Sequence, residues 1–218
     1  MKLKQVTKSK ILFLFIITST LIFAQSEHNT FYENGNPKES GHLNKNGEKI
    51  DDWKFYYENG NVGEQGQFDN NGKEIGEWKW YYESGKLYLI GNYENGEYTE
   101  EWKEYYESGK IKSCGSYKNG KETGERKFYY ENGQLEYVAN YENGKITGKE
   151  KYYHDNGKLA LIGASDEKRK KIGEWKFYYY NGGLKRTGNY ENDKTVGEWK
   201  YYDEEGNLTK TENFQPEK

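Results

Sequence analysis

Residues 76–121 read GEWKWYYESGKLYLIGNYENGEYTEEWKEYYESGKIKSCGSYKNGK and contain almost two copies of one unit. With the Trp of Gly-Glu-Trp-Lys as position zero, the unit recurs eight times at spacings of 24 or 25 residues. A fixed period in this range is typical of a repeat array, in which each unit packs mainly against its neighbours. The residues at position zero are His28, Trp53, Trp78, Trp102, Arg126, Glu150, Trp175 and Trp199.

Two glycine turns divide each unit. A glycine stands seven residues after position zero in all eight units, usually behind Asn or Ser, as in Asn59-Gly60. A second Asn-Gly pair follows in many units, as in Asn95-Gly96. Asn-Gly between aromatic runs is a strong hairpin signal, because a two-residue type I′ turn needs positive φ at both positions. We therefore expect type I′ turns throughout.

The segments between the turns have the alternation of β-strands. In one unit the expected strands are residues 53–57 and 62–68. Alternation places Trp, an aromatic residue and Tyr on one face, and Lys with Tyr on the other. Small residues at position thirteen indicate a close approach, and we expect a ring from a neighbouring strand to lie over each of them. They are Gly41, Gly66, Gly91, Gly115, Ala139, Gly163 and Gly188.

These patterns predict an all-β fold, an elongated antiparallel β-meander of repeated hairpins with about sixteen strands. Aromatic residues make up 17% of the chain, so the core must be aromatic and spread along the array. The long Val, Ile and Leu runs of a parallel α/β enzyme sheet are missing. Amphipathic faces on both sides favour a single open sheet over a closed barrel.

The first 24 residues have the order of a secretory signal peptide: lysines, an apolar run over 11–23, then Ala24. The run is shorter than the ~20 residues of a spanning helix, which makes an uncleaved anchor the weaker alternative. Cleavage would leave a repeat domain over 25–214 and a tail over 215–218, with no later transmembrane segment. Loss of the segment's four lysines changes the net charge from −3 to −7. We expect an exported protein (periplasmic, cell-surface or secreted) and no nucleic-acid partner.

Several positions depart from the repeat. His28 in place of Trp, and Glu212 in place of glycine, are expected to cap the two ends of the array. His154 is interpreted as a substituted ring, and the basic residues 168–171 as a solvated turn or a contact for an anionic group. Cys114 has no second cysteine in the chain, so it is expected to be a half-buried thiol or to form an intermolecular bridge.

The pattern Gly-Glu-Trp-Lys-x-Tyr-Tyr-Glu-Asn-Gly-Lys-Leu, followed by Gly-x-Tyr-x-Asn-Gly-Lys, resembles the MORN repeat variant of bacteria over residues 28–214. The resemblance implies an elongated antiparallel sheet built of hairpins. Many bacterial chains with this repeat are grouped as YwqK-like antitoxins, which implies a toxin as partner.

No motif for catalysis, a cofactor or a metal is found, and the acidic residues recur in every unit, as structural residues do. We therefore expect a protein that is not an enzyme and has no cofactor or metal. The first functional hypothesis is a protein-binding scaffold; the alternative is a module that binds wall polysaccharide or other carbohydrate through exposed Trp and Tyr. The candidate partner-binding residues are Trp53, Trp78, Trp102, Trp175 and Trp199.

Overall fold

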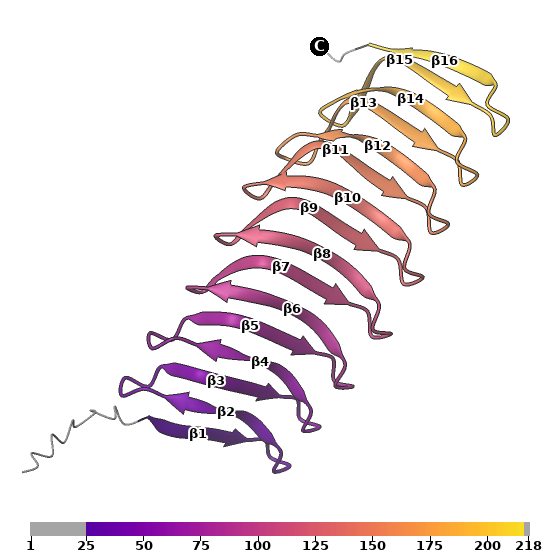
Figure 1. Ribbon diagram of the computed structural model, residues 1–218. Helices are drawn as coiled ribbons and strands as arrows, with labels where there is room; N and C mark the ends of the chain where they lie inside the picture. The colour runs from indigo at the N-terminus through magenta and orange to yellow at the C-terminus, as the bar shows by residue number, and fades with distance from the viewer. Residues whose placement is uncertain (1–24, 216–218) are drawn as a thin grey trace, which may run out of the picture.

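The computed structural model describes residues 25–215, which form one curved sheet of sixteen antiparallel strands (Figure 1). The signal peptide expected over 1–24 and most of the tail expected over 215–218 lie outside the described residues. The first eight strands are β1 Ser26–Phe31, β2 Pro37–Leu43, β3 Lys49–Tyr56, β4 Val62–Phe68, β5 Glu74–Tyr81, β6 Leu87–Glu94, β7 Glu97–Tyr105 and β8 Ile111–Lys118. The others are β9 Lys121–Tyr129, β10 Leu135–Glu142, β11 Lys145–Tyr153, β12 Leu159–Ser165, β13 Lys171–Tyr178, β14 Leu184–Glu191, β15 Lys194–Tyr202 and β16 Leu208–Phe214.

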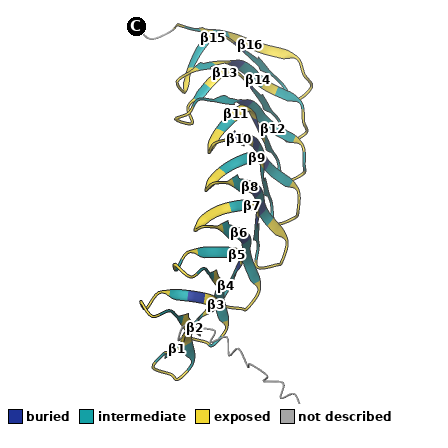
Figure 2. Cartoon of the chain, turned by 60° about the vertical axis from the view of Figure 1, so that its left-hand side comes forward, coloured by how far each residue is buried: buried dark blue, intermediate teal, exposed yellow. Residues whose placement is uncertain are grey.

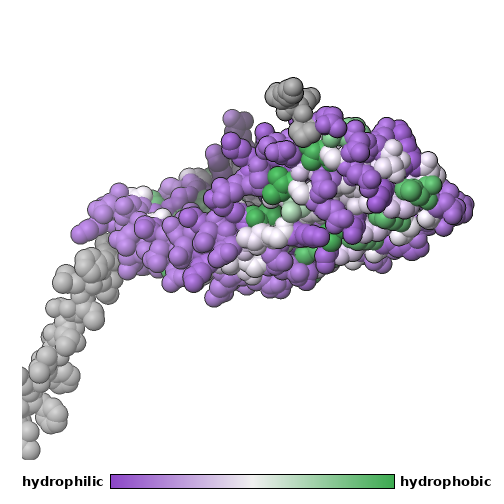
Figure 3. Space-filling model, turned by 90° about the horizontal axis from the view of Figure 1, so that it is seen from above, coloured by the Kyte–Doolittle hydropathy of each residue, from purple (hydrophilic) through white to green (hydrophobic). Residues whose placement is uncertain are grey.

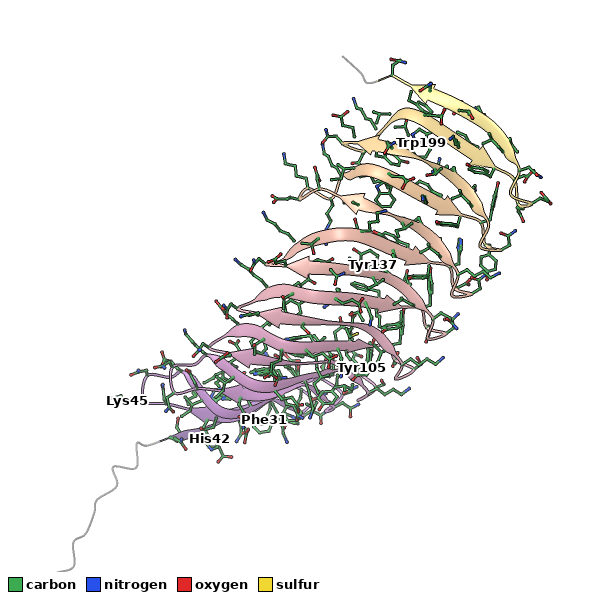
Figure 4. All side chains as sticks on the ribbon, turned by 45° about the horizontal axis from the view of Figure 1, so that its top comes forward. Phe31, His42, Lys45, Tyr105, Tyr137 and Trp199 are labelled. Carbon is green, nitrogen blue, oxygen red and sulfur yellow. The ribbon has the colours of Figure 1, made fainter. Side chains whose placement is uncertain are left out.

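Strand order in the sheet follows strand order in the chain, from β1 at one edge to β16 at the other. This confirms the predicted open meander. The strands are arched and the whole ribbon curves along its length (Figure 2). Side chains stand on both sides of this single layer (Figure 4). Because no second layer covers either face within residues 25–215, a side chain can be buried only by residues of its own and neighbouring strands.

The turn seven residues after position zero is not the predicted type I′ turn. In residues 57–61 the Gly60 N–H donates to Tyr57 O and the Tyr57 N–H to Asn61 O, which is a three-residue loop. Only the glycine has positive φ, at 89°. Asn59 Oδ1 accepts the backbone N–H of Asn61 at 2.9 Å, which favours a type I turn followed by a glycine bulge.

The second turn does follow the prediction in part of the array. Asn95 and Gly96 both have positive φ, at 55° and 82°, and connect the directly paired Glu94 and Glu97. Three further turns have this two-residue form, at 119–120, 143–144 and 192–193. The turns at Gly47 and Gly72 have positive φ at the glycine alone, like the first turn of each unit.

A bulge bends the first strand of every unit after the first. The residue two positions before position zero has positive φ, for example 66° at Gly76 and 58° at Glu100. Pairing shifts at this point: Gln65 faces Lys79, whereas Gln67 faces Ile75. Bulges of this kind bend a strand and increase its twist. The residues are Asp51, Gly76, Glu100, Gly124, Gly148, Gly173 and Gly197.

Candidate functional site

The sheet has two chemically different faces. Trp78 and Trp80 stand on one of them, with ring centroids 5.9 Å apart. Lys79, between them in sequence, stands on the other and pairs with Glu77 at 2.6 Å. We call these the tryptophan face and the lysine face. This separation is the one that alternation predicted. The Glu–Lys pair recurs at Lys103, Lys127, Lys176 and Lys200.

The five repeat tryptophans form the core of the tryptophan face. Trp199 is fully covered, and the exposed fraction of the other four does not exceed 4%. Each ring lies over the position-thirteen glycine of the preceding strand: a Cβ on Gly66 would lie 2.1 Å from Trp78 Cδ2. The ring N–H is satisfied as well, since Trp53 Nε1 donates to His42 O at 3.1 Å and Ile50 O at 3.0 Å.

This burial corrects the role predicted for Trp53, Trp78, Trp102, Trp175 and Trp199. We predicted them as partner-binding anchors, but their covered rings leave almost no surface for a partner to contact. The physical reason is the bend at the bulge together with the missing side chain on the next strand, which lets each indole lie flat against backbone. Their role in this structure is packing.

Half-buried aromatic residues remain accessible on the same face. They stand two positions after position zero, and four of the six pack against the tryptophans: Trp80 lies 5.5 Å from Trp102, and Phe177 lies 6.2 Å from Trp199. The other two pack against Tyr137. Alternation placed these residues on the tryptophan face, but we did not single them out, because sequence does not reveal which of two aromatic columns is covered. We call them the outer ladder: Phe55, Trp80, Phe128, Tyr152, Phe177 and Tyr201.

A tyrosine four positions after position zero connects neighbouring units. Its O–H donates to the backbone carbonyl of the residue at position three in the next unit, at 2.6 to 2.7 Å. The donors are Tyr32, Tyr57, Tyr82, Tyr106, Tyr130 and Tyr179. His154 takes the same place, with Nε2 at 3.3 Å from Tyr178 O, which confirms its interpretation as a substituted ring.

Two units interrupt the tryptophan column with charged residues. Glu150 is only 3% exposed, and its Oε2 accepts the O–H of Tyr137 at 2.9 Å and of Tyr152 at 3.1 Å. Its Oε1 has no hydrogen-bond partner among residues 25–215. Burial, followed by the nearby Glu150 carboxylate, raises the pKa of Tyr152 to about 12. Ala139 stands at position thirteen, where six other units have glycine. Its methyl group is tolerated because the residue at position zero of the next unit is Glu150, which is smaller than Trp.

Arg126 is the second interruption. A Cβ added to Gly115 would lie 2.5 Å from Arg126 Cδ. The arginine side chain therefore covers Gly115 as an indole ring covers the glycine in other units. The guanidinium donates to Ser113 Oγ and Tyr117 O–H, both at 3.3 Å. Ser113 in turn donates to Glu104, which also pairs with Lys112 at 2.8 Å. Burial raises the pKa of Glu104, but the Lys112 ammonium outweighs it and leaves the pKa below its usual value.

The basic segment 168–171 is not simply solvated. Arg169 donates to the Tyr141 O–H at 3.2 Å, and the Lys171 ammonium lies 5.5 Å from the Trp175 ring centre. Two of its four cations therefore contact rings of the tryptophan face, although only Lys171 is half-buried and Lys168, Arg169 and Lys170 are exposed.

The remaining irregular positions also have structural surroundings. The His28 ring packs tilted against Trp53, with ring centroids 5.6 Å apart, and Glu212 faces Trp199 at the last edge, which places both at the ends of the array as expected. Cys114 is a half-buried free thiol. Within residues 25–215 no group of three His, Cys, Asp or Glu is placed to hold a metal ion. In the same range no helix is long and apolar enough to cross a membrane.

The fold and its two faces define a non-globular repeat protein built of β-hairpins. The model of the MORN repeat variant matches residues 52–73, 74–95, 101–119, 122–143, 146–163, 171–192 and 195–215. More than half of the chain is matched, and the chain belongs to the MORN repeat variant family.

Two of the solved structures that match this chain resemble it only weakly. A chain of the crystal structure of TcdB2-TccC3-Cdc42 matches with 14% identity and a TM-score of 0.23, over 83% of this chain and 12% of its own length. A chain of the crystal structure of TcdB2-TccC3 matches with the same identity and TM-score, over 85% and 12%. The chain thus spans about an eighth of the length of these proteins, and such TM-scores carry no argument about its fold. No curated protein matches the chain.

Proposed function

We propose that this protein is a non-enzymatic scaffold that binds another protein through the outer ladder of its tryptophan face. The observation that supports the proposal is the series of half-buried aromatic rings, one in nearly every unit, on a single layer whose opposite face carries Glu–Lys pairs. Accessible aromatic residues with a polar surround are typical of interaction hot spots. Repeat arrays commonly use such extended faces for binding, and MORN repeats are often protein-interaction modules.

Affinity capture tests the proposal directly. The full chain, tagged at its C-terminus, is incubated with envelope and secreted fractions of the source cell, and bound polypeptides are identified by mass spectrometry. A variant with Trp80→Ser, Phe128→Ser and Phe177→Ser removes three accessible rings and leaves the five repeat tryptophans in place. We expect one stoichiometric polypeptide that the variant no longer retains.

A lysine-face variant is the matched control. Lys79→Ala, Lys127→Ala and Lys176→Ala change the same units on the opposite face, where exposed ion pairs contribute little to stability. Circular dichroism and the urea midpoint establish that both variants are folded. Retention of the polypeptide by the ladder variant, or its loss from the control alone, contradicts the proposal.

The same eluate is assayed for sugar. Recovery of wall polymer or other glycan without a stoichiometric polypeptide contradicts the scaffold and favours the carbohydrate-binding alternative. An antitoxin-like role is the finer form of the proposal, and it requires that the captured polypeptide be toxic to cells that lack this chain. Export is part of the proposal too, and its test is a mature N-terminus at Gln25 in the extracytoplasmic fraction.

A further inference from the structure

Lys185 and Arg186 are adjacent cations on the tryptophan face. Some cations of this face pair with carboxylates: Lys49 lies 2.7 Å from Glu39, and Lys112 is paired with Glu104. Within residues 25–215, Lys185 and Arg186 lie over rings instead of forming such pairs. The Lys185 ammonium is 5.3 Å from the Tyr179 ring centre, and the Arg186 guanidinium carbon is 4.2 Å from that of Phe177.

A shallow groove of about 520 Å³ lies directly beside these two cations. Ala160 belongs to its lining, at the position where earlier units carry Lys38, Gly63, Tyr88, Lys112 or Glu136. Only Gly63 is smaller than Ala160, and there the Tyr57 ring lies against the missing side chain. Hydrophobic side chains gather among hydrophilic ones over this C-terminal part of the array (Figure 3), and Figure 4 shows the side chains on the sheet around Trp199. The groove's other walls include Leu161, Phe177, Tyr179 and Tyr201, with His154, Tyr178, Tyr202 and Thr209 completing the lining.

Two acidic side chains close in sequence or register to the groove's lining have partners of their own. Glu212, beside Tyr201 on β16, forms an ion pair with Lys210. Asp155 accepts the Tyr180 O–H at 2.8 Å. Among residues 25–215, the lining of the groove contains Lys185 and Arg186 and no Asp or Glu, on a chain whose acidic residues outnumber its basic ones. A guanidinium that packs against an aromatic ring and has no carboxylate partner keeps donors available for a carboxylate.

We infer that this groove binds an acidic peptide segment of the partner protein, with a carboxylate on Lys185 and Arg186 and an apolar side chain against Leu161 and Phe177. The inference rests on the proposed scaffold function and specifies the chemistry of the partner. The aliphatic wall at Leu161 favours a peptide over an acidic polysaccharide, because a sugar acid has no apolar side chain to place there.

Fluorescence anisotropy with two synthetic probes tests the inference. One is a short labelled peptide rich in glutamate and tyrosine, and the other has lysine in place of every glutamate. The full-length chain is expected to bind the first and not the second, with an affinity that falls as salt rises. The Lys185→Gln, Arg186→Gln variant is expected to lose about tenfold or more in affinity, because each charge-assisted contact it removes is worth at least about that factor.

Lys38→Gln is the matched control. Lys38 occupies the same column as Lys185 and also lies over a tyrosine ring, 5.9 Å from the centre of Tyr32, but its neighbour is Glu39 instead of an arginine. We expect it to leave binding unchanged. Since Arg186 also packs on Trp199, Lys185→Gln alone is measured as a second variant, with a smaller loss expected.

Three outcomes overturn the inference: equal binding by both peptides, equal loss in Lys38→Gln, or unchanged binding after both charges at the groove are removed. Preferential binding of a uronic-acid polymer over the acidic peptide overturns it as well. Capture of a partner that the Lys185→Gln, Arg186→Gln variant still retains refutes this inference while leaving the scaffold function intact. Binding of the acidic peptide without capture of any partner protein supports this inference while contradicting the scaffold function.

Discussion

Packing of each tryptophan over a glycine makes a sharp prediction for the Gly91→Ala variant. Gly91 lies in β6 beneath the Trp102 ring, and an added Cβ would be 2.1 Å from Trp102 Cδ2 and 2.3 Å from Cε2. Ordinary contact between carbons needs about 3.4 Å or more, so the ring would have to move by roughly 1.3 Å. The Gly91 backbone does not have positive φ, and steric conflict is therefore the whole effect on the folded state.

The magnitude follows from what the moving ring loses. Overpacking of this kind costs about 1–3 kcal/mol. The hydrogen bond from Trp102 Nε1 to Thr99 O, at 3.2 Å, would lengthen, and such a bond contributes roughly 1 kcal/mol. We expect Gly91→Ala to lower the free energy of unfolding by about 2–4 kcal/mol.

The same column provides two controls within this chain. At Gly115 the added Cβ meets Arg126 Cδ at 2.5 Å, a flexible chain that can rotate away, so Gly115→Ala is expected to cost about 1 kcal/mol. Ala139, at position thirteen of the unit with Arg126, already has a Cβ, and Ala139→Gly is expected to destabilise by about 1–2 kcal/mol through lost burial and added backbone freedom. Adding a methyl group at Gly91 is thus expected to lower the free energy of unfolding, and so is removing one at Ala139.

Urea unfolding followed by tryptophan fluorescence and by far-ultraviolet circular dichroism measures these differences. Where the two probes give the same transition, the free energies of unfolding are calculated with the dependence on urea concentration fixed at the wild-type value. Equal losses for Gly91→Ala and Gly115→Ala, or a Gly91→Ala variant as stable as wild type, would refute the packing of indole against glycine as the source of the stability.

Three further variants test other contacts by the same unfolding assay. Tyr106→Phe removes the O–H donated to Tyr129 O at 2.6 Å and should cost about 1 kcal/mol; no loss would mean that this contact between units is not stabilising. Glu100→Gly relieves a positive φ of 58° at a bulge where most units have glycine and should add about 1 kcal/mol, whereas destabilisation would contradict the strain. Glu104→Gln should be less stable than wild type at pH 7. Because the folded pKa of Glu104 lies below its usual 4.5, the stabilisation is present above that value and fades as pH falls below it; a pH-independent difference would contradict the ion pair with Lys112.

Much of the fold follows from periodicity. The 24- or 25-residue period, the glycine turns and the alternation of residues such as Trp78, Lys79 and Trp80 predicted the meander and the composition of its two faces. The strand glycines predicted a ring overhead, and Gly66 lies under Trp78 as expected. The predicted conformation of the Asn59-Gly60 turn was wrong, because it depends on a register set by the paired strands and on the Asn59 side chain, which accepts a bond from nearby backbone.

The sequence by itself determined that this protein is an all-β repeat array with an aromatic face and a charged face, since both properties arise from periods of two and of 24 or 25 residues. Only the tertiary structure decided which aromatic column is covered. A bulge at Gly76 and a missing side chain at Gly66, ten residues apart in sequence, together bury Trp78, while Trp80 stays half exposed beside it. Tertiary structure likewise brought Lys185 and Arg186 beside the groove at Leu161, because burial and charge pairing depend on contacts between strands rather than on the identity of a residue.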